Sequence, residues 1–167
     1  MKRVVHHRIR CCNRTFDIEE WCKYLDDVRN GRQERITTTF GRFTFNDCDI
    51  CTNPDTYTLE TESKNSYGYR VEIYIAECGN GIWVYGLDEK HGDGGSCFGA
   101  SWSDDRRKGF PSEKEAKDAA CRYVIDSLST VRNYSHADMV KVEKLKGMVE
   151  DFRRSLSRPK VTQLELF

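Results

Sequence analysis

The feature that most constrains the fold is a change in the spacing of apolar residues along the chain. Between Ile18 and Val28 they recur every three or four positions, which is typical of a helix with one apolar face. From Ile36 to Trp102 they alternate with polar residues, which is typical of half-buried β-strands. Helical spacing then returns in the C-terminal part. The sequence therefore predicts an α+β fold: an antiparallel β-sheet (meander) with a helix packed on it, an N-terminal helix, and a C-terminal helix followed by a flexible tail.

Local signals set the expected helix boundaries. Asp17 and Glu20 are spaced as a capping box, and Gly31 ends the first helical pattern. Ser112 and Glu115 have the same spacing before the second helix. A third helix is expected to start near Ser135. Pro159 disfavours helical structure after it, so an extended tail is predicted.

The alternating runs are expected to be the strands of the meander, and glycines mark the turns between them. The runs cover residues 36–45, 57–59, 67–75, 82–84 and 98–102. Gly79-Asn80-Gly81 predicts a tight hairpin, because these residues accept positive φ. A longer loop is expected from Asp88 to Ser96. Its acidic residues and His91 predict a solvated loop, although the group could also hold a metal ion.

At 167 residues the chain is long enough for one ordinary hydrophobic core with small additions. We expect four regions in this order: a basic arm and N-terminal helix (1–35), a β-rich domain ending in a packed helix (36–130), a C-terminal helix (131–157) and an extended docking tail (158–167). No run approaches the roughly 20 apolar residues that span a bilayer, and no signal peptide is recognisable. A cytoplasmic protein without a membrane partner is therefore expected.

The net charge of zero hides a strong asymmetry along the chain. Residues 46–105 carry 3 Lys and Arg against 12 Asp and Glu, whereas residues 106–167 carry 14 against 9. A phosphate-binding surface is therefore expected in the C-terminal part, and the acidic middle is expected to repel nucleic acid or to face a basic partner.

Cys48 and Cys51 have the two-residue gap with which a tight turn can present two thiolates to one zinc ion. In a reducing cytoplasm, cysteines are better interpreted as thiols or metal ligands than as disulfides. Zinc is therefore a possible cofactor if other residues complete the site, with His6, His7, Cys11, Cys12 and Cys22 as the candidates in the N-terminal arm. Ordinary thiols are the alternative. Cys78, Cys97 and Cys121 are expected to be small core residues.

The chain ends in Gln163-Leu164-Glu165-Leu166-Phe167. This peptide resembles the motif Gln-Leu-x-Leu-Phe with which bacterial polymerases, repair proteins and many plasmid and phage proteins bind the replication sliding clamp. The resemblance implies that Leu166 and Phe167 fill one apolar subsite, that Leu164 fills a neighbouring one, and that the Gln163 amide hydrogen-bonds at the pocket edge. Alternatively, the alternating apolar residues could form an edge strand on the chain's own sheet.

Residues 67–128 give three expected strands followed by a helix, a layout similar to the β-β-β-α part of double-stranded RNA-binding domains. In that family a lysine cluster at the start of the helix meets backbone phosphates, and Lys114 and Lys117 match it. Arg106, Arg107 and Lys108 lie just before this helix and add to the local positive charge. The resemblance implies possible binding of double-stranded nucleic acid. The alternative is a scaffold whose lysines are merely solvated.

Phosphate-binding, serine-nucleophile and zinc-protease motifs are absent from the sequence, and no catalytic residue is assigned. We therefore expect a non-enzymatic, DNA-associated accessory or regulatory protein of a bacterium, phage or mobile element, recruited to the sliding clamp by its C-terminal peptide. Three alternatives stay open: a nucleic-acid-binding module that uses the start of the helix at 112–128, an inhibitor of a host defence or replication protein, and a small zinc or thiol-dependent enzyme.

Overall fold

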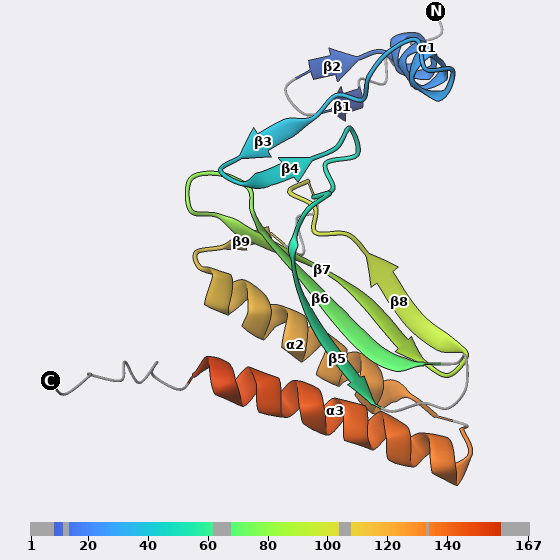
Figure 1. The fold of residues 1–167 in the computed structure, drawn as a ribbon, viewed down its shortest axis with the longest axis vertical. Coiled ribbons are helices and arrows are strands. Elements are labelled where there is room, and N and C mark those ends of the chain that lie inside the picture. The colour runs from blue at the N-terminus through green and yellow to red at the C-terminus, as the bar shows by residue number, and fades with distance from the viewer. Residues whose placement is uncertain (1–8, 12–13, 62–67, 104–107, 133, 158–167) are drawn as a thin grey trace, which may run out of the picture.

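The protein is an elongated α+β molecule, with a helix and short hairpins at one end and a helix-covered sheet at the other (Figure 1). The computed structural model describes residues 9–11, 14–61, 68–103, 108–132 and 134–157. The elements are β1 (Ile9–Cys11), β2 (Arg14–Phe16), α1 (Ile18–Arg29), β3 (Thr38–Phe40), β4 (Phe43–Phe45), β5 (Asp55–Thr61), β6 (Tyr69–Glu77), β7 (Trp83–His91), β8 (Gly94–Phe98), β9 (Lys108–Phe110), α2 (Glu113–Thr130) and α3 (His136–Leu156). The predicted fold class is confirmed.

In the described part of the chain, the main sheet has five antiparallel strands. β5, β6, β7 and β8 are neighbours in chain order, as in a meander, and β9 pairs with the start of β7 on the same edge as β8. The register places Ile73 of β6 between Tyr57 of β5 and Leu87 of β7. Asn80 and its two glycine neighbours all have positive φ in the turn between β6 and β7, so the predicted hairpin is confirmed.

Both long helices lie on one face of this sheet. α2 lies against β6 and β7, and α3 lies against β5 and β6 (Figure 1). Ala116 and Ala120 are fully buried, and their small side chains let α2 approach the strands closely. The fully buried residues of this core include Val71, Ile73, Ile75, Leu87, Val124, Val142, Leu145 and Val149. Among the described residues, no helix is long and apolar enough to cross a membrane.

A smaller core lies on the opposite face of the sheet. Phe43 and Phe45 of β4 pack against Ala76 and Val84, which are cross-strand partners in β6 and β7. Gly86 allows the chain to cross this face, because a Cβ there would lie 2.2 Å from the backbone nitrogen of Ala100. The main sheet therefore separates two hydrophobic clusters.

A buried carboxylate holds α1 to the rest of the molecule. Asp47, in the turn after β4, is 2 % exposed. Its two oxygens accept hydrogen bonds from the Tyr24 hydroxyl of α1 (2.9 Å) and from Arg35 (2.8 Å). The Asp17–Glu20 capping box that begins α1 is present as predicted.

The prediction of a long loop from Asp88 to Ser96 is wrong. β7 continues to His91 and β8 begins at Gly94, so the connection is a short turn. The glycines suggested a loop, but Gly95 lies within β8. A Cβ on Gly95 would be 1.9 Å from the carbonyl oxygen of Glu89. Close approach of the two backbones requires glycine here.

Other strand boundaries also differ from expectation. The run predicted at 98–102 contributes only Phe98 to β8, and the residues after it cross the sheet instead. β9 was not predicted, nor was the β1–β2 hairpin within the expected basic arm. These strands have three residues each, too few to show an alternating pattern.

Candidate functional site

The predicted clamp-binding residues Gln163, Leu164, Leu166 and Phe167 lie outside the described residues. The last described helix, α3, ends at Leu156. Its last turns are fixed to the body, because Arg153 bonds Asp118 of α2 (2.6 Å) and the Phe152 ring lies 5.6 Å from that of Tyr57. The chain therefore leaves the described structure from a fixed point beside the N-terminal half of α2.

The predicted nucleic-acid-binding residues are only partly described. Arg106 and Arg107 lie outside the described residues, and for Lys108 only the backbone is described, at the start of β9. Lys114 is exposed on the first turn of α2. The Lys117 side chain is only 14 % exposed. It pairs with Glu113 and lies 4.0 Å from the centre of the Tyr57 ring.

Lys117 is therefore part of the contact between α2 and β5. Glu113 also accepts a hydrogen bond from the Tyr57 hydroxyl (2.9 Å), so the three side chains form one group. The Lys117 ammonium donates a hydrogen bond to the Glu113 carboxylate and keeps the pKa of that carboxyl below its usual value. A phosphate at Lys117 would have to compete with Glu113.

Charges near the start of α2 and the end of α3 balance. The cations are Lys114, Lys117, Arg122, Arg153 and Arg154, and the anions are Glu113, Glu115, Asp118, Glu150 and Asp151. Ion pairs join Arg122 and Arg153 to Asp118, and Arg154 to Asp151. Among the described side chains, this end of the molecule carries no strong positive field.

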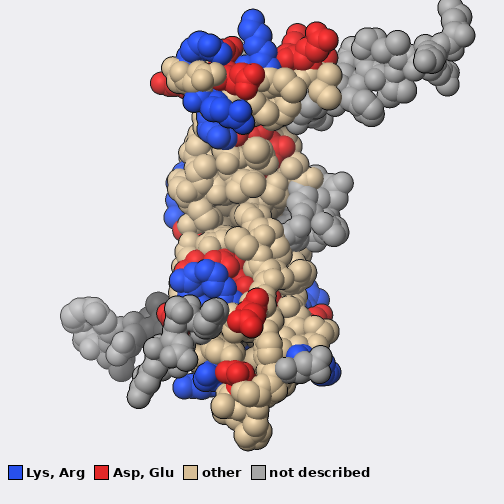
Figure 2. Space-filling view, turned by 90° about the vertical axis from the view of Figure 1, so that its right-hand side faces the viewer, with Lys and Arg blue, Asp and Glu red and all other residues tan. Residues whose placement is uncertain are grey.

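The acidic surplus of residues 46–105 does not form one acidic surface on the face drawn in Figure 2. There, Asp and Glu side chains mix with Lys and Arg at the α1 end and in the lower part, and a largely uncharged band separates them. Three of the acidic residues, Asp47, Asp49 and Glu89, are buried. Part of the surplus counted from the sequence is therefore inside the protein.

Cys48 and Cys51 lie in the turn after β4, but in different environments. Cys48 is exposed, whereas Cys51 is 6 % exposed. Burial raises the pKa of both thiols, and neighbouring Asp47 raises that of Cys48 further, so both favour the thiol over the metal-binding thiolate. Within the described part of the chain, no three His, Cys, Asp or Glu side chains are placed to hold a metal ion.

The remaining predictions for cysteines had mixed outcomes. Cys121 is fully buried, and burial raises the pKa of its thiol to about 12, as expected for a core residue. Cys78 is half-buried, and Cys97 is exposed on β8, so the prediction for Cys97 is wrong. Cys97 alternates with residues that face the helices and therefore points to the open face of the sheet.

A buried polar cluster, which the sequence analysis missed, lies where β7 passes under the helices. Tyr85, Leu87, Glu89 and His91 alternate along β7 on the helix-covered face. Glu89 is 1 % exposed, and its Oε1 accepts a hydrogen bond from Ser127 of α2 (3.0 Å). Within the described residues, Glu89 Oε2 has no hydrogen-bond partner. Burial raises the pKa of Glu89.

His91 is the second titratable member of this cluster. Its Nε2 lies 3.5 Å from Glu89 Oε1, and its Nδ1 lies 3.2 Å from the Tyr134 hydroxyl. The same hydroxyl donates to the backbone oxygen of His91 (3.0 Å). Burial lowers the pKa of His91, because the imidazolium form loses its hydration.

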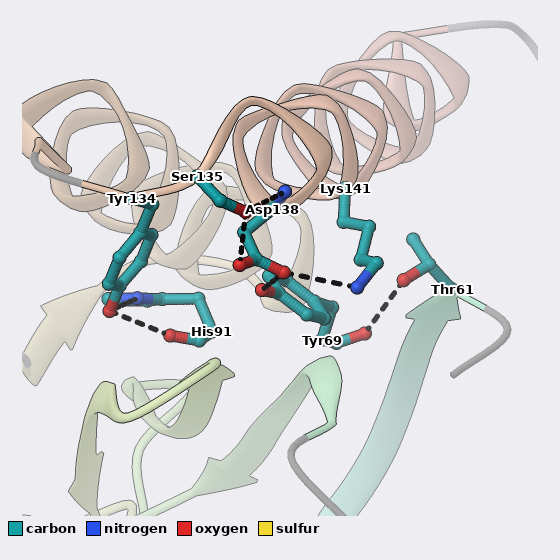
Figure 3. A network of polar contacts seen from close by, with 7 residues as sticks. All are labelled: Thr61, Tyr69, His91, Tyr134, Ser135, Asp138 and Lys141. Atoms are coloured by element: carbon teal, nitrogen blue, oxygen red, sulfur yellow. Dashed lines mark hydrogen bonds and ion pairs between the residues drawn. The ribbon is translucent and has the colours of Figure 1, made fainter. Parts of the chain in front are cut away.

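The cluster continues to the start of α3, as Figure 3 shows. Asp138 accepts hydrogen bonds from Tyr69 of β6 (2.8 Å), from Lys141 (3.1 Å) and from Ser135 (2.6 Å). Burial raises the pKa of Tyr69 to about 12, and the bond to Asp138 adds to the effect. Polar contacts therefore join β6, β7 and both helices at this end of the sheet.

One sequence signal could have revealed the cluster. Every second residue of β7, from Tyr85 through Leu87 and Glu89 to His91, lies on the same face of the sheet as Ile73 of β6. Counting by two would have placed Glu89 in the core. The acidic and glycine-rich composition suggested a solvated loop instead, and this interpretation is wrong.

A shallow groove of about 370 Å³ lies between α2 and α3. It is lined by Asp118, Ile125, Glu150, Arg153, Arg154 and Ser157. Two acidic and two basic side chains face it, and the cations already pair with carboxylates. The groove favours no particular charged ligand.

Comparison with known proteins places the chain in no family. No family model, curated protein or solved structure matches it.

Proposed function

We propose that this protein is a non-enzymatic, DNA-associated accessory or regulatory protein that docks on the bacterial replication sliding clamp through Gln163, Leu164, Leu166 and Phe167. The observation that carries the proposal is the five-residue pattern at 163–167. The partner is the clamp, and the source is a bacterium, a phage or a mobile element. The folded body would be the part that the peptide brings to replicating DNA.

The position of α3 supports this proposal. The helix ends at Leu156, and Arg153 and Phe152 fix its last turns to α2 and β5. Gln163 follows Ser157 by six positions in the chain. Fully extended, six residues reach roughly 20 Å. A clamp pocket could therefore take the peptide without disturbing the packing of α3.

Docking of this kind is expected to be transient. Burial of each large apolar side chain contributes roughly 1.5–3 kcal/mol. Ordering the peptide and losing rigid-body freedom offset much of the sum, which leaves an affinity on the order of micromolar. Contact of this strength recruits the protein and lets it dissociate readily.

The test is binding of the full chain to purified bacterial sliding clamp, measured by calorimetry. Replacing Leu166 and Phe167 together by Ala should weaken binding by about 100-fold or more, since each side chain accounts for roughly a tenfold change or greater. Glu165→Gln is the matched control, because the third place of the motif varies, and its affinity should stay within a few-fold of the unchanged protein. No binding by the unchanged chain, or equal binding by the double variant, would refute the proposal.

The same double variant separates docking from the alternative of an internal edge strand. If Leu166 and Phe167 packed on the chain's own sheet, their loss would lower the melting temperature as other core truncations do. For a docking peptide the melting temperature should not change. A lowered melting temperature together with absent clamp binding would support the edge strand.

The nucleic-acid-binding alternative has less support from the described residues, because Lys117 is paired and the surrounding charges balance. It predicts salt-sensitive binding of duplex RNA or DNA that Lys114→Glu weakens. Filter binding at two salt concentrations would reveal such an activity, and its presence without clamp binding would replace the function proposed above.

A further inference from the structure

The hydrogen bonds around His91 determine where its protons lie. The Tyr134 hydroxyl has one hydrogen, and it donates this hydrogen to the backbone oxygen of His91. With that hydrogen on the carbonyl oxygen, we assign the Nδ1 atom of His91, 3.2 Å from the same hydroxyl, as the donor in that contact. Nδ1 carries a proton, and Nε2, the nitrogen near Glu89, is the position at which the ring titrates.

Proton counting extends from the ring to Glu89. A bare Nε2 lone pair beside an ionised carboxylate, 3.5 Å apart, would set two acceptors against each other. One proton between Nε2 and the carboxyl group removes this conflict, either as a neutral carboxyl and neutral ring or as a carboxylate and imidazolium. Glu89 Oε2, which lacks a partner within the described residues, favours the neutral pair, because ionisation would leave it unsolvated.

We propose that the Glu89–His91 pair holds one proton near neutral pH and that this proton controls how firmly the connection between α2 and α3 packs on the sheet. Loss of the proton leaves a buried carboxylate next to a neutral ring. Addition of a second proton leaves a buried imidazolium. In both states the charge gains hydration when Tyr134 and the start of α3 move away, because the Glu89 side chain is fully buried and the His91 side chain is only 11 % exposed.

The groups facing the pair come from every element packed around it. β6 contributes Tyr69, the cross-strand partner of His91, α2 contributes Ser127, and the connection contributes Tyr134. From α3, Asp138 and Lys141 form their own ion pair, and Asp93 lies in the β7–β8 turn. Because Asp138 and Lys141 already neutralise each other, neither is free to replace the shared proton.

The shifts of the two pKa values agree in direction with a shared proton. Burial raises the pKa of Glu89 and lowers that of His91, so the neutral forms of both are favoured. As pH rises through the raised pKa of Glu89, the stability of the folded state falls, because the unfolded carboxyl has already ionised. As pH falls through the lowered pKa of His91, stability also falls, because the unfolded ring takes up a proton first.

The test is hydrogen exchange of the amides of residues 134–140 between pH 5 and 9, corrected for intrinsic exchange rates. The unchanged protein should be best protected at an intermediate pH. Above that pH, the equilibrium constant for opening of this segment should rise by up to about tenfold per pH unit, which is the limit when opening releases one proton. Glu89→Gln should abolish this alkaline rise, since an amide accepts from Ser127 but cannot ionise.

Asp88→Asn is the matched control, because Asp88 is the next residue on β7, points to the open face and contacts Arg70. Asp88→Asn removes one carboxylate charge, as Glu89→Gln does at alkaline pH, but the rise of the opening equilibrium constant at alkaline pH should remain. A rise that persists in Glu89→Gln, or protection that does not depend on pH in the unchanged protein, would overturn the proposal.

A direct measurement guards against misfolding of the variant. The ¹³C shift of the Glu89 carboxyl, followed in the unchanged protein, should report a protonated group at pH 6. An ionised Glu89 together with a neutral His91 ring at that pH would also overturn the proposal. Neither measurement depends on clamp binding, so failure of one proposal leaves the other intact.

Discussion

Two buried carboxyl groups in this protein have opposite surroundings. Asp47 accepts hydrogen bonds from Tyr24 and Arg35, and one of these donors is a cation. Glu89 accepts one bond, from Ser127, and its other oxygen lacks a partner within the described residues. A buried charge is tolerated when donors surround it and is costly when they do not. The first group therefore fixes α1, whereas the second makes its surroundings sensitive to pH.

Gly94 gives a prediction at the scale of one methyl group. A Cβ at this position would lie 2.5 Å from Cε1 of His91 and 3.0 Å from the Tyr134 hydroxyl. Gly94→Ala should therefore push His91 out of its contacts and lower the free energy of unfolding by about 1–3 kcal/mol. Thermal and urea unfolding would measure the loss.

Gly68→Ala is the matched control for this substitution. Among the described residues, nothing lies within 4 Å of a Cβ at Gly68, and the φ of Gly68 is not in the left-handed region. Its stability should change by less than about 0.5 kcal/mol. Equal effects of the two substitutions would mean that the contact between Gly94 and His91 is not tight.

At the residue scale, the sequence predicted those positions whose role depends on near neighbours in the chain. Asp17 caps α1 and Ser112 accepts from the Glu115 amide at the start of α2, as their spacing indicated. The burial of Glu89 depends on Ser127, which is 38 residues away. Composition around Glu89 contained no information about that contact.

The start of α3 gives a pH-dependent prediction at the scale of an element. The Ser135 side chain, with Tyr69 and Lys141, lowers the pKa of Asp138 from 3.8 to about 2. A lowered pKa means that the stabilisation is present above about pH 4 and is lost as pH falls through about 2. Asp138→Asn should therefore lower the melting temperature clearly at pH 7 and much less at pH 2.

Asp151→Asn is the control at the other end of α3. Asp151 is exposed and pairs with Arg154 one turn away, so its loss should change the melting temperature little. Differential scanning calorimetry at both pH values would compare the variants. A constant difference between Asp138→Asn and the unchanged protein across this range would contradict the prediction.

Element boundaries followed from the sequence where a pattern was long enough. α2 and α3 have 18 and 21 residues; α2 begins at the predicted cap Ser112, and α3 begins near Ser135 as predicted. β9 has three residues, and its strand character comes only from pairing with Trp83 and Val84 of β7. Short strands of this kind depend on a partner that the sequence does not identify.

The two hydrophobic clusters give a prediction for the whole molecule. One lies under the helices and the other lies on the opposite face, and Trp83 contacts both. Because β6 and β7 contribute to each cluster, we expect one cooperative unfolding transition. Leu145→Ala should lower stability by about 2–5 kcal/mol and Phe45→Ala by about 3–5 kcal/mol, each in that single transition.

Circular dichroism in the far and near ultraviolet would follow helices and aromatic packing separately. The unfolding curves from the two spectral regions are expected to coincide for both variants. Val140→Ala is the control, because Val140 on α3 is 56 % exposed and its loss should change stability little. Two separate transitions, one affected only by Phe45→Ala, would contradict the expected coupling across the sheet.

The sequence by itself determined the fold class, the helix starts, the β6–β7 hairpin and the residues of the proposed clamp peptide. Each of these depends on residues that are close together in the chain. Tertiary structure decided which charges are available. It placed the Lys117 ammonium over the Tyr57 ring of β5 and brought Ser127 of α2 onto the buried Glu89 carboxyl. It also gave Cys48 and Cys51 different exposure. Burial and pairing depend on residues brought together from distant parts of the chain, and for that reason local patterns predicted the elements better than the electrostatics.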